Sequence, residues 1–193
     1  MNRKTLLVIA TALFCICFAS HAQSRIHFNA DYHYLLGISQ KNGSYSSLHR
    51  SDMKMSGSSF RLAGMYSLNT RMDIGIGIGT ECYEKPKITT FPIFASARYS
   101  PLKRTLSPYI YADAGYAFGT KISDRGILAD LGIGYKHMFK KHFGIKFEVG
   151  YNMQHIQVDK ENIIVFPTSN SVAPSKGASV FRHSISFGTG FIF

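Results

Sequence analysis

The chain has 193 residues, about the length of one domain. Its 22 Lys and Arg outnumber 11 Asp and Glu, yet charged residues form only 17% of a sequence that holds 15 Phe, 11 Tyr and 17 Gly. This composition excludes a disordered chain, because such chains lack aromatic and β-branched residues. Beyond the N-terminus no apolar run reaches the roughly 18 residues of a membrane-spanning helix, and three Cys are too few for a disulfide scaffold.

Residues 1–22 have the pattern of a secretory signal peptide. Two basic residues precede an apolar run over residues 5–19, and the segment ends with small residues up to Ala22. The apolar run is short for a transmembrane anchor. We therefore expect an exported mature chain that begins at Gln23, carries a net charge of +9 and keeps one cysteine, Cys82.

The mature chain divides into eight runs in which apolar and polar residues alternate between turn residues. A period of two is typical of strands, and no segment shows helical periodicity. Most runs exceed the about five or six residues usual in globular strands, and they match the roughly 9–11 residues of a strand that crosses a bilayer. The predicted strands are Arg25–Ile38, Ser58–Leu68, Met72–Glu84, Thr89–Tyr99, Pro108–Phe118, Gly126–Phe139, Phe143–Gln157 and Ala178–Phe193.

The connections between these runs differ in length. Those after the second, fourth and sixth runs are short or compact, whereas residues 39–57 and 158–177 form long loops, and the other two loops are intermediate. Short turns at one end and longer loops at the other are typical of an outer-membrane barrel. We predict that residues 23–193 form an all-β, eight-stranded antiparallel up-and-down transmembrane β-barrel.

The polar face of the runs separates a membrane barrel from a soluble sandwich, which also alternates. In the run from Phe143 to Gln157, aromatic and aliphatic residues share one face, and glycine and charged residues share the other. Interior glycines weaken a solvated strand, but an eight-stranded barrel has an interior only just wide enough for side chains. We therefore expect the apolar face to meet lipid. In the opposite case the apolar faces would form the core of a secreted sandwich or a ligand-holding barrel.

The same alternation places eleven charged side chains in the interior. Buried charges are tolerated when they are paired, and five positive and six negative charges nearly balance in a strongly basic chain. This balance predicts a lumen plugged by ion pairs. The predicted network is Asp31, Arg61, Asp73, Glu81, Arg98, Asp113, Asp130, Lys136, Lys146, Glu148 and Arg182.

Two segments carry a resemblance to a known family. The closing run ends SISFGTGFIF over Ser184–Phe193, with a terminal aromatic residue, and Ser107–Tyr116 reads SPYIYADAGY. They resemble small bacterial outer-membrane β-barrels of the porin or OmpA-like transmembrane-domain type, and the resemblance covers residues 23–193. It implies an outer-membrane location and a C-terminal strand that the barrel-assembly machinery recognises through Phe187, Phe191 and Phe193.

Histidines are the first candidates for chemistry in the interior and on the wall. His27 and His33 share the inward face, but a strand rises about 3.3 Å per residue, so they lie roughly 20 Å apart and cannot share an ion. A contact between Asp31 and His33 stays open, and hydrogen bonding in the lumen is the role expected of these side chains. We predict no metal site here.

His155 and His183 are predicted to face outward near the same rim. Some barrels of the resembled type are lipid A deacylases with a His, a Ser and an acid on the lipid-facing wall. Here Ser184 and Ser186 are predicted to face inward, and no outward acid accompanies the histidines. Interfacial positioning of amphipathic rings is therefore the expected role, and Cys82 is expected to be a small lipid-facing residue.

These features favour a structural or surface-interaction protein, without a cofactor or catalytic residues. A narrow porin for small solutes is the second hypothesis, and a lipid A-modifying enzyme is the third. The expected surroundings are outer-membrane lipid and lipopolysaccharide, whose phosphates the loop lysines can meet. We also expect a monomer, no nucleic acid, and an extracellular partner for loops 39–57 and 158–177. The apolar stretch Ile163–Pro167 is expected to contact the barrel's own rim.

Overall fold

The computed structural model describes residues 25–42, 46–49, 55–84, 88–102, 106–119, 126–140, 143–158 and 178–193. The predicted signal peptide and the stretch Ile163–Pro167 lie outside these residues. No helix long and apolar enough to cross a membrane occurs among them. The strands are β1 (Ile26–Asn42), β2 (Ser46–His49), β3 (Ser56–Ser67), β4 (Met72–Tyr83), β5 (Ile88–Tyr99), β6 (Leu106–Gly119), β7 (Gly126–Lys140), β8 (Phe143–Val158) and β9 (Ala178–Ile192).

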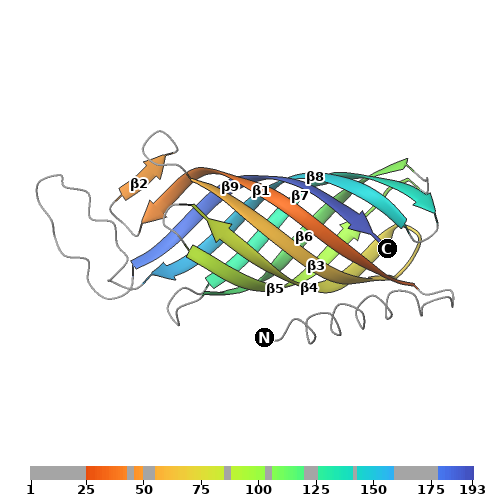
Figure 1. The fold of residues 1–193 in the computed structure, drawn as a ribbon, viewed down its shortest axis with the longest axis horizontal. Coiled ribbons are helices and arrows are strands. Elements are labelled where there is room, and N and C mark those ends of the chain that lie inside the picture. The colour runs from red at the N-terminus through yellow and green to blue at the C-terminus, as the bar shows by residue number, and fades with distance from the viewer. Residues whose placement is uncertain are drawn as a thin grey trace, which may run out of the picture.

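Eight of the strands close into an antiparallel barrel (Figure 1). From β3 to β9 each strand pairs with the next, and β1 closes the ring by pairing with both β3 and β9. At the closing seam Asn29 lies opposite Ile192, and Phe28 and Phe193 exchange two backbone hydrogen bonds of 2.6 and 2.9 Å. The predicted all-β, eight-stranded up-and-down barrel is confirmed.

The strand β2 is a correction to the predicted loop over residues 39–57. β1 continues to Asn42, beyond the predicted end at Ile38, and pairs with β2 from Ser39 opposite His49 onward. Apart from Leu48, residues 39–42 and 46–49 are polar, so they lack the apolar alternation that marks the other strands. The extension gives the wall around β1 an additional short hairpin strand.

The two ends of the barrel differ in their connections. One end, here called the turn end, carries the short connections from β3 to β4, β5 to β6 and β7 to β8, together with the C-terminus. The opposite end, the loop end, carries β2 (Figure 1). Asn69 shows how a short turn is built, because its side-chain oxygen accepts hydrogen bonds from the backbone N–H groups of Arg71 and Met72 at 2.8 and 2.9 Å.

Burial alternates along the strands as the sequence predicts. Along β8, Phe147 and Val149 are exposed on the outside, whereas Lys146 and Glu148 are buried inside. The outer wall is apolar, and Ile76, at 74% exposed, is its extreme. This arrangement reverses that of a soluble barrel, because the large apolar side chains are the exposed ones. The molecule is therefore built with charge inside and hydrocarbon outside.

Candidate functional site: the charged interior

The pleat of each strand directs the predicted network residues into the barrel. Nine of the eleven are buried, and Asp73 and Lys136 are half-buried. Eight of them form ion pairs with one another in two clusters. The turn-side cluster is Asp31, Arg98, Lys146 and Glu148, and the loop-side cluster is Arg61, Glu81, Asp113 and Asp130.

The turn-side cluster balances two positive and two negative charges. The Lys146 ammonium lies 2.7 Å from Asp31 Oδ2 and 3.1 Å from Glu148 Oε1. The Arg98 guanidinium lies 3.5 Å from an oxygen of each of these carboxylates. Tyr109 adds a hydroxyl that donates to Glu148 at 2.6 Å. Each buried carboxylate thus meets two cations, which offsets the cost of removing it from water.

Glycines of β9 allow this cluster to form across the strand. Gly190 lies opposite both Asp31 on β1 and Lys146 on β8, and Gly188 lies opposite both His33 and Glu148. A Cβ on Gly188 would stand 2.7 Å from His33 Cε1, and one on Gly190 would meet Asp31 Oδ1. Because β9 has no side chain at these two positions, side chains from β1 and β8 contact each other over it.

The loop-side cluster surrounds one arginine with three carboxylates. Arg61 lies 2.9 Å from Glu81, 3.1 Å from Asp130 and 3.3 Å from Asp113. Ser59 accepts a further hydrogen bond from Arg61 Nε at 3.2 Å. All of these side chains are buried, and this cluster carries an excess of negative charge.

Several contacts cross the full width of the interior. In the ring of eight strands, β3 stands opposite β7 and β4 stands opposite β8. The ion pair from Arg61 to Asp130 joins the first two strands. The Tyr83 hydroxyl donates to Gln154 Oε1 and thereby joins the second two. Contacts between opposite walls occupy the axis of the barrel at two levels.

Inward-facing tyrosines extend the network over glycines of neighbouring strands. Tyr111 on β6 passes over Gly132 and Gly150, each of which would place a Cβ against the ring or its hydroxyl. Its hydroxyl lies 3.2 Å from Asp130 and 3.5 Å from Ser186 on β9. The interior glycines therefore leave the space that large polar side chains of neighbouring strands occupy.

Three predicted network residues lie inside without an ion pair among the described residues. Asp73 accepts a hydrogen bond of 2.6 Å from Ser67, and Lys136 lies half-buried on β7. The Arg182 guanidinium carbon lies 4.3 Å from the centre of the Tyr83 ring, in a cation–π contact. Pairing is therefore concentrated in the middle of the barrel.

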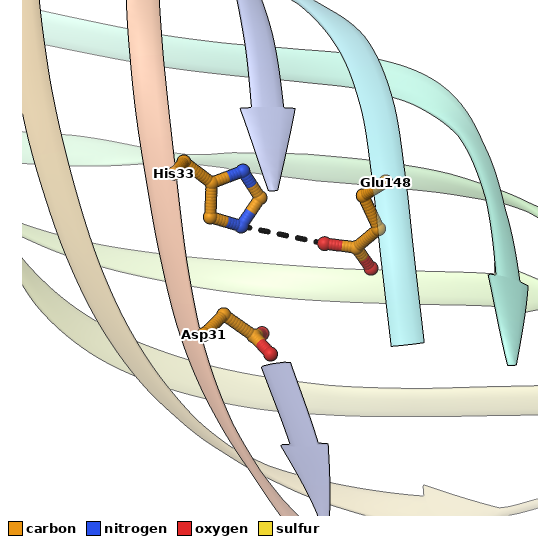
Figure 2. Close-up of side chains that lie close together, drawn as sticks. All are labelled: Asp31, His33 and Glu148. Atoms are coloured by element: carbon orange, nitrogen blue, oxygen red, sulfur yellow. Dashed lines mark ion pairs between the residues drawn. The ribbon is translucent and has the colours of Figure 1, made fainter. Parts of the chain in front are cut away.

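Asp31, His33 and Glu148 place potential metal ligands within 4.8 Å of one another (Figure 2). His33 Nε2 lies 3.3 Å from Glu148 Oε2. The histidine therefore pairs with Glu148, and the contact with Asp31 that the sequence left open is not its ion pair. Lys146 and Arg98 already contact both carboxylates. Their positive charges oppose the entry of a metal cation, and the arrangement is that of an ion-pair cluster.

The outer wall places His155 and His183 among aromatic rings. The His155 ring lies 4.5 Å from the ring of Phe181, and Tyr151 Oη lies 2.5 Å from His183 Nδ1. Ser184 and Ser186 are buried inside, on the other face of β9. Cys82 is exposed on the wall, and Thr89 Oγ1 lies 3.8 Å from its sulfur.

The aromatic residues of the last strand also line the outer wall. Phe187, Phe191 and Phe193 are exposed, and Phe191 stacks on Phe143 with ring centres 6.2 Å apart. Phe139 continues the stack on Phe143. These rings form part of an aromatic belt near the turn end.

Sequence reasoning missed the polar side chains that link the charged clusters. Tyr109 and Tyr111 alternate in phase with Asp113, and Tyr83 alternates in phase with Glu81, so the period of two already places these tyrosines inside. Their partners depend on which residues of neighbouring strands lie opposite each other. That register is not encoded in the pattern of one strand alone.

No protein-family model and no curated protein matches the sequence. Among solved structures, Neisserial surface protein A matches with a TM-score of 0.52 and 17% identity, covering 86% of this chain and 96% of that chain. OprG from Pseudomonas aeruginosa matches with a TM-score of 0.46 and 12% identity, covering 87% and 95%. The N-terminal barrel domain of OprF from the same organism gives 0.46 and 14%, covering 86% and 97%. The first likeness shows that this chain has the fold of the eight-stranded outer-membrane β-barrels.

Proposed function

From this barrel fold, we propose that the protein is an integral component of a bacterial outer membrane. Its role is structural or surface-interacting, and its lumen is closed by charge pairs. The large exposed apolar side chains of the wall support the membrane location. Ile76, Leu131 and Ile133 are each at least 65% exposed, and such a surface is stable in hydrocarbon and prone to association in water.

The main support for a closed lumen is the ion pair between Arg61 and Asp130. It joins opposite walls, and the turn-side cluster adds a second layer of charges closer to the turn end. A solute crossing the barrel would have to separate buried ion pairs, each costly to break. An interior of this size is filled by side chains.

Conductance of the purified barrel in a planar bilayer tests this closure. We expect no unitary current steps above background, while the same preparation shows the heat-modifiable electrophoretic mobility of a folded barrel. Reproducible unitary steps from folded protein would contradict the closed lumen and favour the narrow porin. Ion selectivity of such steps would then identify the charges that line the path.

We propose a non-enzymatic role for the outer wall. His155 and His183 contact aromatic rings, and the adjacent Ser184 and Ser186 point into the barrel. Ser39 on β1 lies opposite His183, but Nδ1 of His183 contacts the Tyr151 hydroxyl, and neither histidine forms an ion pair with a carboxylate among the described residues. The lipid A mass spectrum should be unchanged after overexpression. A loss of acyl chains that His183→Ala abolishes would instead establish a lipid A-modifying enzyme.

The export route and the partners form part of the same proposal. Residues 1–22 act as a signal peptide, the barrel-assembly machinery recognises the last strand, and loops 39–57 and 158–177 face the cell exterior of a monomeric protein. An epitope tag near Ser171 should bind antibody on intact cells, and a tag between Lys103 and Arg104 should not. Labelling of the second tag alone would reverse the orientation.

A further inference from the structure

The outer wall has an apolar groove near the turn end. It has a volume of about 770 Å³ and lies over β3, β4, β5 and β6. Ile26, Tyr66, Ile74 and Ile76 stand along it, and all four belong to the exposed wall. The groove is thus open to the same surroundings as the wall.

Four alanines create the hollow. Ala95 lies opposite Ala114 and Ala97 lies opposite Ala112, so four methyl groups form a square over two adjacent strands. Gly64 also lines the hollow. A Cβ at this position would make only ordinary van der Waals contact, 3.5 Å from Phe28. Packing inside the barrel therefore does not require this glycine, unlike the glycines of β9.

Two arginines lie at the turn end, each next in sequence to a strand whose residues line the groove. Arg25 precedes Ile26 and donates a hydrogen bond of 3.4 Å to the hydroxyl of Tyr66, which lines the groove. Arg71 lies in the turn that leads to Ile74, and its carbonyl accepts from Ser100 N–H at 2.7 Å. Both arginines are exposed, and neither has an acidic partner among the described residues.

We propose that this groove binds the acyl chain of an anionic glycerophospholipid, with Arg25 and Arg71 contacting its phosphate-bearing headgroup. The groove supplies the hydrocarbon contact, and the guanidinium groups match phosphate oxygens in geometry and charge. This inference rests on the proposed membrane location. Because the turn end faces the periplasm in that orientation, the lipid belongs to the periplasmic leaflet.

Native mass spectrometry of the folded barrel, released from detergent micelles, tests the proposal with phosphatidylglycerol and phosphatidylcholine of identical chains. Wild-type protein should retain phosphatidylglycerol in preference by at least about fivefold, since one arginine near a membrane surface contributes about that factor. The Arg25→Gln/Arg71→Gln variant should bind both lipids equally. The Lys41→Gln variant, changed at the opposite end, should keep the preference.

Groove filling tests the apolar part separately. Ala97→Leu/Ala112→Leu should lower retention of both lipids, whereas Ala30→Leu, a matched change on the outer face of β1, should not. Equal retention of both lipids by wild-type protein would overturn the proposal, as would a preference for lipid A or a predominant dimer. Each variant is also tested for heat-modifiable electrophoretic mobility, which shows that its barrel is folded. Loss of lipid binding by a folded variant thus concerns the groove, whereas an unfolded barrel would concern the proposed function.

Discussion

Arg61 neutralises part of a buried cluster of three carboxylates. Removing one partner of a buried ion pair leaves an uncompensated charge, which costs about 3–5 kcal/mol. We therefore expect Arg61→Met, which keeps much of the side-chain length, to lower the free energy of unfolding by about that amount. Urea unfolding in detergent measures the change.

The exposed Arg71 provides the matched control for Arg61. Arg71→Met should change the free energy of unfolding by less than about 0.5 kcal/mol, as surface changes usually do. Equal effects of the two substitutions would show that the interior ion pairs contribute little to stability.

Tyr109 connects the turn-side cluster to β6 through its hydrogen bond to Glu148. Tyr109→Phe removes this hydroxyl and keeps the ring, so the expected cost is about 1–3 kcal/mol for a lost hydrogen bond to a buried charged group. Tyr135→Phe, on the exposed outer face of the adjacent strand, should be near neutral. If the two variants unfold at the same urea concentration, this role of the Tyr109 hydroxyl is contradicted.

Among the strands, β9 depends most clearly on missing side chains. Gly188→Val would place a side chain between His33 and Glu148, where even a Cβ stands 2.7 Å from the imidazole. We expect a large loss of folded protein, seen as loss of heat-modifiable mobility after refolding. Gly64→Ala on the outer face meets only ordinary contact and should refold normally. Normal refolding of the Gly188 variant would show that the contact over β9 is dispensable.

The end of β9 is also where assembly is expected to begin. Phe193 pairs with Phe28 through its backbone and exposes its ring on the wall. Phe193→Ser keeps the backbone pairing, so refolding in detergent should be unaffected, whereas the amount of barrel assembled in cells should fall severalfold. Phe181→Ser, near the loop end of the same strand, should assemble normally. A parallel fall of refolding and assembly would assign Phe193 a role in stability alone.

Alternation along single strands predicted the number of barrel strands and the inward side of every network residue. It did so because the two faces of a wall strand meet different surroundings, and a period of two records that difference. The hairpin strand β2 was missed because Leu48 is its one apolar residue, which is too few for an alternating pattern. The pairing of His33 with Glu148 was missed because it requires the registers of β1 and β8 against β9, including two glycines.

At the scale of the whole molecule, the charged side chains lie in the interior and the large apolar side chains lie on the outer wall, the reverse of a soluble protein. The ring closes between β1 and β9, the first and last strands of the chain, so the contacts of Asp31 and His33 with side chains of β8 form only when the barrel is closed. Each ion pair that crosses the lumen then joins strands far apart in the sequence, such as Arg61 and Asp130. Stability of the interior and closure of the barrel are therefore linked.

The most direct test of a lipid-facing apolar wall uses the absence of tryptophan from the chain. Single variants Phe147→Trp, on the exposed wall, and Phe94→Trp, buried inside, give two barrels with one fluorophore each. In vesicles of phospholipid brominated on its acyl chains, fluorescence of the Phe147 variant should be strongly quenched and that of the Phe94 variant largely retained. Stronger quenching of the Phe94 variant, or none in either, would contradict a barrel whose apolar face meets the membrane.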